Sequence, residues 1–397
     1  MRAAPTVVAV AAIDHRMRVR TAAVLTAGTL LMGPVGVLHA AVLPEERLDL
    51  LYHSYDGGGV EVTGPSLMVR KQIGQSLSVS GNYYLDSVSS ASIDVVTTAS
   101  PYKDERTETS LGLDYLHQKS TLSLSLTRSD ENDYEATSVG VGVSQDLFGD
   151  LTTISFGFGL GSDDVGRRGD PAFSESVDRY QYRLGLTQVL TTRLVATLAW
   201  ETQSDEGYLN NPYRSVRYID PGAPVGYSWQ AEVYPSTRTS DAASIRAKYF
   251  LPYRAAVFAG YRWYDDTWEI NADTYELGYI HPFDNGWLVE ARYRRYAQRA
   301  AEFYSDLFPF ADAQNFLARD KELSSFSSDT LGLTVSYEYS GAPGGWLDRA
   351  SINFAYDRVR FEYSDFRDLT GSTGVVGAEP SYAFDADVVQ VYVSVFY

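Results

Sequence analysis

The sequence contains no cysteine among its 397 residues. This absence excludes a disulfide framework, a thiol nucleophile, an iron–sulfur cluster and a thiolate zinc site. Histidine is scarce too: after residue 40 it occurs only at His53, His117 and His281, without the spacing of a metal site. The sequence also has no Gly-x-Ser-x-Gly elbow and no phosphate-binding glycine loop before a helix. We therefore expect no cofactor, no metal site and no enzymatic activity.

Positive charge is in short supply, with 33 lysines and arginines against 51 aspartates and glutamates and a net charge of −18. Proteins that bind nucleic acid need an excess of cations to neutralise phosphates, so we expect no nucleic-acid partner. After residue 40 no apolar run is long enough for a membrane-spanning helix. A membrane β-barrel is still compatible with this sequence, because its strands alternate apolar with polar residues and need no long apolar run.

One apolar run does occur near the amino terminus, where residues 16–41 have the order of a secretory signal peptide. Three arginines come first, an apolar run from Thr21 to Leu38 follows, and small residues end the segment. We predict that residues 1–40 are a signal peptide cleaved after Ala40, and that residues 41–397 form a single domain. Met17 is a candidate start, which would make residues 1–16 an untranslated upstream extension. An uncleaved anchor is the alternative, but the run falls short of the about 20 residues that a spanning helix needs.

The sequence is rich in aromatic residues, with 30 Tyr, 17 Phe and 6 Trp. It is also rich in segments in which apolar residues alternate with polar ones. In residues 120–128, Leu122, Leu124 and Leu126 alternate with serine and threonine, and similar segments recur along the chain. We predict strands at residues 47–55, 59–71, 76–87, 107–118, 120–129, 135–147, 151–162, 178–190, 193–204, 239–251, 254–266, 271–282, 286–298, 326–340, 349–362 and 384–397.

The connections between these strands alternate in length. Tight turns such as residues 147–151 and 251–254 separate longer segments such as 204–238 and 298–325. Short turns on one side and long loops on the other are typical of outer-membrane barrels. We predict an all-β transmembrane antiparallel up-and-down β-barrel of about sixteen strands, with short periplasmic turns and long external loops. Both termini then lie on the periplasmic side.

The start of this domain resembles a known family. Its Tyr-Asp-Gly-Gly-Gly turn at residues 55–59, its Gly-Pro-Ser strand from Gly64 and its segment from Tyr83 to Ser92 resemble an uncharacterised family of Gram-negative outer-membrane barrels, classed as a domain of unknown function. The resemblance extends from about Glu45 to Tyr397. It implies a place in the cell outer membrane, and it carries no established activity and no assigned catalytic residues.

Charged residues occupy the face of several strands that lies opposite the apolar face, and we expect that face to line the lumen. The candidates are Arg183, Arg246, Lys248, Arg262, Glu290, Arg292 and Arg294. Two interpretations stay open. The cations either pair with lumenal carboxylates such as Glu276, Glu290 and Glu338 and brace the wall, or form an electropositive stripe that favours anionic solutes.

Three further features lie near strand ends or in loops. We expect an interfacial aromatic girdle, whose members are Tyr83, Tyr84, Trp200, Trp263, Trp268, Trp287, Trp346, Tyr392 and Tyr397. We expect a solvated acidic surface, with Ca²⁺ or Mg²⁺ binding as the alternative, from Asp130, Glu131, Asp133, Asp163, Asp164, Asp265 and Asp266. The loop from Ala301 to Leu323 has helical, partly apolar character, and either folds inward as a constriction or caps the barrel mouth.

The final strand ends in an aromatic carboxy terminus after alternating valines. Val393, Val395, Phe396 and Tyr397 resemble the carboxy-terminal signal that outer-membrane assembly machinery recognises. We expect outer-membrane lipid and this machinery as partners, and oligomerisation stays open. The function we favour is a passive pore or solute-selective channel with a partly basic lumen. The alternatives are a non-conducting scaffold or export component that receives a periplasmic partner and, with less support, a barrel hydrolase that acts on lipid.

Overall fold

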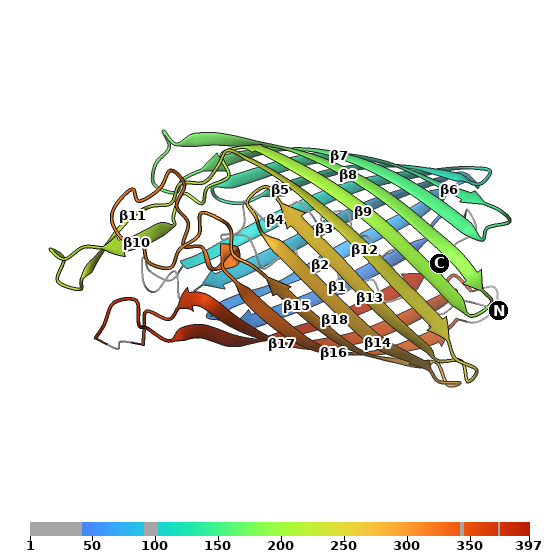
Figure 1. Cartoon of the computed structure of the whole chain (residues 1–397). Coiled ribbons are helices and arrows are strands. Elements are labelled where there is room, and N and C mark those ends of the chain that lie inside the picture. Colours follow the sequence, from blue (N-terminus) through green and yellow to red (C-terminus); the bar gives the residue numbers. More distant parts are fainter. Residues whose placement is uncertain (1–41, 91–101, 342–344, 372–373) are drawn as a thin grey trace.

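The computed structural model describes residues 42–90, 102–341, 345–371 and 374–397. The predicted signal peptide and part of the connection between the strands predicted at residues 76–87 and 107–118 lie outside these described residues. The described chain forms a closed antiparallel barrel of sixteen strands, which Figure 1 shows as a tilted cylinder. The fold class predicted from alternation is therefore confirmed.

Each predicted strand has a counterpart in the barrel. The barrel strands are β1 (Arg47–Gly57), β2 (Val60–Ile73), β3 (Leu77–Ser90), β4 (Tyr102–His117), β5 (Ser120–Asp130), β6 (Tyr134–Leu147), β7 (Thr152–Gly166), β8 (Ser174–Thr191), β9 (Leu194–Gly207), β12 (Thr237–Phe250), β13 (Ala256–Asp266), β14 (Asn271–Pro282), β15 (Trp287–Gln298), β16 (Phe326–Ser340), β17 (Arg349–Arg367) and β18 (Ser381–Phe396). Consecutive barrel strands pair with each other.

The barrel closes where the first strand meets the last. β1 pairs antiparallel with β18 from Arg47 opposite Phe396 to Gly57 opposite Ala386. This seam leaves no strand edge unpaired, as a sheet that crosses a lipid bilayer requires. At the far end of β1, Gly58 and Gly59 both have positive φ, at 58° and 77°. Only glycine adopts such a pair of conformations readily, so the turn into β2 can be this tight.

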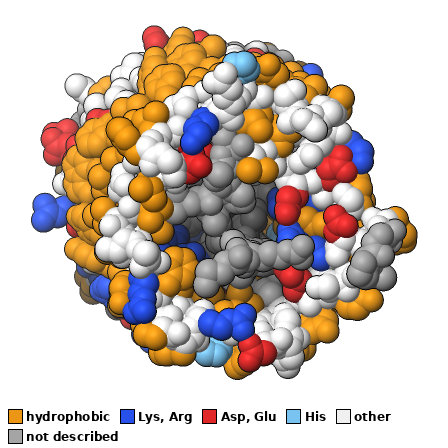
Figure 2. All heavy atoms as spheres, turned by 90° about the vertical axis from the view of Figure 1, so that its right-hand side faces the viewer, with side chains coloured by type: hydrophobic (Ala, Val, Ile, Leu, Met, Phe, Trp, Pro, Cys, Tyr) orange, Lys and Arg blue, Asp and Glu red, His pale blue; other side chains and the backbone are white. Residues whose placement is uncertain are grey.

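The strand register fixes which side chains point outward. Large apolar side chains at alternate positions are exposed, including Leu111 at 57%, Leu277 at 59% and Leu331 at 65%. Polar or small residues occupy the positions between them and face inward. Figure 2, which looks at the end with the short turns, shows hydrophobic side chains over much of the outer surface. An apolar outer wall around a polar interior is the arrangement that lipid favours.

Some of the residues expected in an aromatic girdle face outward, as a girdle requires, and three do not. Trp200 and Trp263 face outward on neighbouring strands, with ring centroids 6.3 Å apart. Tyr84 and Tyr392 instead occupy inward positions, and Trp268 is buried in the turn between β13 and β14. For Tyr84 and Tyr392 the error comes from strand parity, because the neighbours of an outward residue face inward. Trp268 instead packs in the apolar cluster of the external loops.

The loops at the other end contain structure that alternation did not predict. The connection between β9 and β12 forms a hairpin of its own, β10 (Ser215–Ile219) and β11 (Tyr227–Ala231). The expected helical character of residues 301–323 is wrong, because the only helix there is one 3₁₀ turn, η1 (Lys321–Leu323). No helix in the described ranges has the length and apolar character needed to span a membrane. In Figure 1 this loop and β10–β11 lie together at the end away from the short turns.

The seam suggests a test of the carboxy-terminal signal. Phe396 faces inward, and the guanidinium carbon of Arg349 lies 3.9 Å from the centroid of its ring. The Tyr397 hydroxyl donates a hydrogen bond to the Arg70 carbonyl oxygen at 3.1 Å. We predict that deleting Phe396 and Tyr397 leaves secretion intact but prevents assembly of the barrel in the membrane. The measurement is the shift in gel migration between unboiled and boiled membrane fractions.

The matched control is Phe283→Ala, which removes an exposed aromatic residue from a short turn and should leave assembly unchanged. Normal assembly of the truncated chain would remove these residues from the proposed signal.

Candidate functional site

The seven charged residues predicted to line the lumen all lie at inward positions of the barrel wall. Arg183 is on β8, Arg246 and Lys248 on β12, Arg262 on β13, and Glu290, Arg292 and Arg294 on β15. Their outward neighbours include the exposed side chains of Ile245, Tyr261 and Tyr293. The register sets Arg294 opposite Glu276 and Arg262 opposite Ser244. The structure thus gathers the seven on one part of the wall, whereas their role in transport stays a prediction.

These residues differ in how completely their charge is compensated. Arg292 donates to Asp357 across two strands at 2.7 Å, which braces the wall. Arg183 lies 3.7 Å from Glu201, and its Nε and Nη2 atoms are buried without a hydrogen-bond partner. Asp357 and Glu201 are not among the carboxylates that the sequence suggested, because cross-strand neighbours depend on register. Glu276 is among them, and it forms an ion pair with Arg246.

Three cations on β12 and β13 form no hydrogen bond with the described residues. Arg246 lies 3.6 Å from Glu276, too far for a good hydrogen bond. Lys248 and Arg262 form neither a hydrogen bond nor an ion pair with any residue in the described part of the chain. Together with Arg183 they form a group that we call the cationic patch, defined as Arg183, Arg246, Lys248 and Arg262. The nitrogen donors of Arg246, Lys248 and Arg262 form no hydrogen bond with the described residues, whereas Arg183 Nε and Nη2 are buried.

The wall next to the cationic patch is lined by small residues. Gly157 on β7 lies directly opposite Arg183, and Gly142 and Ser123 continue the same row on β6 and β5. Inward positions on these strands are otherwise serine, threonine or glycine over the central part of each strand. Long cations therefore project beside a wall that takes up little lumenal space.

Elsewhere on the inner wall, arginines are held by carboxylates. Arg70 donates to Asp114 at 2.9 Å, and Arg179 donates to Asp163 at 2.6 Å. Arg238, which is 2% exposed, pairs with Asp266. Asp163 and Asp266 were expected on a solvated acidic surface, and this expectation is wrong. They face inward and compensate arginines that would otherwise be buried alone.

A histidine network that the sequence did not reveal joins β1 to β3. His53 Nε2 lies 2.8 Å from Asp86 Oδ1 and 2.7 Å from the Tyr84 hydroxyl. Gly64 on β2 is the register partner of His53 and puts no side chain between them. The Gly-Pro-Ser segment was the available signal, since glycine in a strand often marks a close approach of backbones. A Cβ on Gly64 would lie 1.7 Å from the Leu85 carbonyl oxygen.

The external loops pack together as a cap with its own apolar core. Leu209 and Tyr234 from the β9–β12 connection, Phe303 from the β15–β16 connection and Trp268 are buried in one cluster. Val233 and Leu317 exchange backbone hydrogen bonds at 2.9 and 2.7 Å. Of the two placements considered for residues 301–323, these contacts favour a cap on the barrel mouth.

A buried ion network ties three loops of the cap together. Arg217 on β10 is fully buried and donates to both carboxylate oxygens of Glu379, at 2.7 and 3.1 Å. It also donates to the carbonyl oxygen of Asp306 at 2.9 Å and pairs with its carboxylate. We call Arg217, Asp306 and Glu379 the loop latch. Burial raises the pKa of Glu379, but the hydrogen bonds and charge of Arg217, together with backbone hydrogen bonds, hold that pKa below its usual value.

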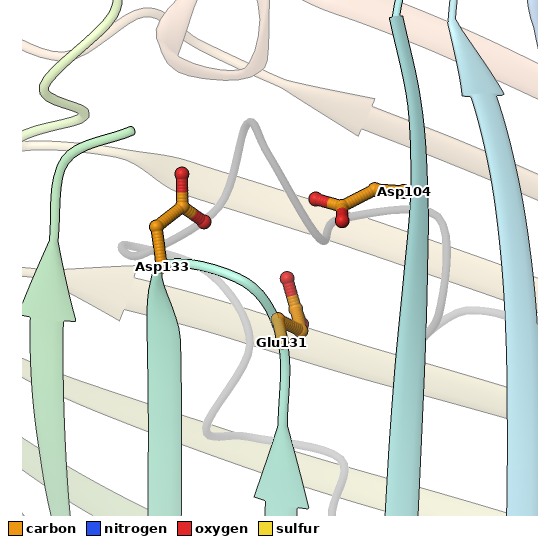
Figure 3. A group of neighbouring side chains, drawn as sticks. All are labelled: Asp104, Glu131 and Asp133. Atoms are coloured by element: carbon orange, nitrogen blue, oxygen red, sulfur yellow. The ribbon is translucent and has the colours of Figure 1, made fainter. Parts of the chain in front are cut away.

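Three carboxylates at the external end lie close together, as Figure 3 shows. Oxygens of Asp104 on β4 and of Glu131 and Asp133 after β5 all lie within 4.8 Å of one another. Oxygen ligands of this kind suit a hard cation. However, Asn132 donates to Asp104, and Tyr213 from the β9–β12 connection donates to Asp133. These contacts anchor the cap to the neighbouring loop, so we assign the cluster to loop structure.

Comparison with known proteins yields one family and no close relative of known function. The profile described as "Protein of unknown function (DUF3570)" matches residues 92–182 and 172–356. The opening motif at residues 55–66 precedes the matched part. No curated protein matches the chain.

Several solved structures share the barrel at low identity. The siderophore receptor PirA of Pseudomonas aeruginosa is 12% identical, with 88% of this chain and 62% of the receptor covered and a TM-score of 0.44. OccK7 (OpdD) of Pseudomonas aeruginosa is 14% identical, with 88% and 98% covered and a TM-score of 0.41. A bacterial polysaccharide outer membrane secretin is 8% identical, with 89% and 99% covered and a TM-score of 0.47. We transfer no function from them.

The loop latch makes a prediction about the cap. Arg217→Met leaves the buried carboxylates of Asp306 and Glu379 facing each other without a cation, and breaking such a pair costs about 3–5 kcal/mol. We predict that external loops in this variant are cleaved by added protease at least tenfold faster, while the barrel remains heat-modifiable. Because the pKa of Glu379 is lowered, the latch should hold at neutral pH. It should weaken only as the pH falls below the usual range of a carboxylate.

Arg254→Met is the matched control, because Arg254 pairs with Asp284 in an exposed short turn, where an ion pair contributes little. Equal cleavage of the Arg217→Met and wild-type loops would contradict a latch.

Proposed function

The chain belongs to the DUF3570 family of unknown function, and we propose from its own geometry that it is a passive channel of the cell outer membrane that favours anionic solutes. The observation that carries the proposal is the cationic patch. Its donors lack hydrogen-bonded partners on an inner wall where other arginines are compensated. Small residues on β5–β7 leave lumenal space beside it. A fixed set of cations in a narrow aqueous path raises the local concentration of anions.

The proposed place in the membrane rests on the outer wall. Exposed leucines, valines and tyrosines occur at alternate positions of most strands, and their polar neighbours face inward. The predicted signal peptide and the aromatic carboxy terminus fit export to the periplasm followed by insertion from that side. A role in passage of solutes makes no use of a catalytic group, and the chain is proposed as a non-enzyme.

The cap gives one specific observation in favour of the second candidate, a non-conducting scaffold for a periplasmic partner. A loop assembly with a buried core and a buried ion network keeps its shape, and a mouth covered in this way suits a barrel that does not conduct. The third candidate, a lipid hydrolase, requires a catalytic site that reaches the lipid. His53 instead faces inward and bonds Asp86 and Tyr84.

Conductance across a planar bilayer separates the first two candidates. We predict that the purified barrel conducts and that its reversal potential in a potassium chloride gradient shows a preference for chloride. Arg262→Glu places a negative charge among the cations of the patch and should lower the chloride-to-potassium permeability ratio at least about threefold.

Arg254→Glu serves as the control, since it makes the same charge change in a short turn outside the lumen and should leave the ratio unchanged. A barrel that assembles but does not conduct would refute the channel. Crosslinking in membranes would then be expected to capture a stoichiometric periplasmic partner.

A further inference from the structure

Arg246 is unusually available among the inward arginines. Its side chain is 43% exposed, whereas those of Arg179 and Arg238 are 11% and 2% exposed. It donates no hydrogen bond to any described residue, and its nearest carboxylate, that of Glu276, is 3.6 Å away. Its guanidinium therefore keeps its N–H donors free for a solute.

A stack across two strands fixes the position of this guanidinium. The Arg246 guanidinium carbon lies 4.3 Å from the centroid of the Phe258 ring on β13. Phe258 is 3% exposed and lies directly opposite Gly278 on β14. A Cβ on Gly278 would be 2.1 Å from the Phe258 ring, so the ring rests on the bare backbone of β14. Gly278 leaves room for the Phe258 ring, and the face of that ring makes a cation–π contact with the Arg246 guanidinium.

Charges around the stack define the kind of anion that fits. Lys248 lies directly opposite Phe258 on the neighbouring strand and adds a second cation. Gly260 on β13 is the register partner of Arg246 on one side and of Glu276 on the other. Glu290 lies on β15, the strand that pairs with β14. Glu276 and Glu290 offset much of the attraction that Arg246 and Lys248 exert on an anion. The cost of removing an anion from water rises more steeply with its charge than this weakened attraction does, so the site favours a single negative charge over a compact double one. A guanidinium fork matches the two oxygens of a carboxylate.

We propose that Arg246, held by Phe258 and Gly278 and assisted by Lys248, forms a binding subsite for small monocarboxylates in the lumen. The subsite rests on the proposed function, because solutes must be able to enter the lumen to reach it. Arg246 contacts the carboxylate, whereas Phe258 and Gly278 act as positioning residues. The site combines an inward glycine, Gly278, with an aromatic register partner, Phe258. The strand on the other side of Phe258 carries the inward cations Arg246 and Lys248.

Acetate binding to the purified full-length mature barrel in detergent tests the subsite without relying on conductance. Ligand-observed NMR would measure the dissociation constant for wild-type protein and variants. Arg246→Gln should weaken acetate binding at least about tenfold, because it removes a charge-assisted bidentate contact. Gly278→Ala forces the Phe258 ring to move and should weaken binding about threefold to fivefold with every charge retained.

Gly142→Ala is the matched control for the glycine. It adds the same methyl group to another inward glycine, where the nearest atom would be an ordinary 3.6 Å away, and should leave acetate binding unchanged. Arg246→Lys retains the charge without the fork, so it should restore little of the affinity lost in Arg246→Gln. Retention of the heat-modifiable fold in each variant shows that an altered affinity does not reflect misfolding.

The outcomes separate this inference from the channel itself. A wild-type barrel that binds no acetate, or equal binding by Gly278→Ala and wild type, overturns the subsite. Stronger competition by inorganic phosphate than by formate overturns the monocarboxylate class. If the barrel does not conduct but binds acetate through Arg246, the subsite stands and the channel fails. If it conducts with acetate binding unaffected by Arg246→Gln, the channel stands and the subsite fails.

Discussion

Pairing between β1 and β18 is the constraint on which the rest of the structure depends. A sheet in lipid cannot leave an edge with unpaired backbone groups, so the first and last strands must meet. Once Arg47 lies opposite Phe396, the number of strands and the register fix which residues share a row of the wall. The contents of the lumen follow from this seam, because every inward side chain takes its neighbours from the rows that closure sets.

The inner wall then has to accommodate arginine in a closed space. Burying a guanidinium alone is costly, and a carboxylate on a neighbouring strand offsets the cost. Arg70, Arg179 and Arg292 follow this rule with Asp114, Asp163 and Asp357. The cationic patch departs from it, since these cations lack a hydrogen-bonded carboxylate. This difference in hydrogen bonding is the physical basis for the proposal that a solute path runs beside the cationic patch.

Much of the barrel could be predicted from the sequence because alternation is a local signal. Leu122, Leu124 and Leu126 mark an outward face without knowledge of any partner strand. The hairpin β10–β11 escaped prediction because its strands have only five residues each. Residues 301–323 were misread as helical, because their backbone groups bond to distant segments, as Leu317 does to Val233. Local sequence carries no record of such contacts.

The same distinction applies to the site. Strand parity placed the seven charged residues on the inner wall, but it could not say which of them would find a partner. Arg292 meets Asp357 from 65 residues away, and that contact depends on the register of two intervening strand pairs. Gly278 is harder still, because a glycine in a strand reads as a weak strand former. Its role appears only when Phe258 is seen opposite it.

The two ends of the barrel differ in how much structure their connections contain. Short turns close one end with few residues, whereas the external connections bury an apolar core and fully enclose Arg217. The charges of the loop latch are compensated within the loops, whereas the apolar core also includes Val165 and Val177 from the barrel strands β7 and β8. In the proposed channel, the loops and the cationic patch have separate roles. The loops would govern entry from outside, and the cationic patch would govern the preference for anions, because the two groups share no residue.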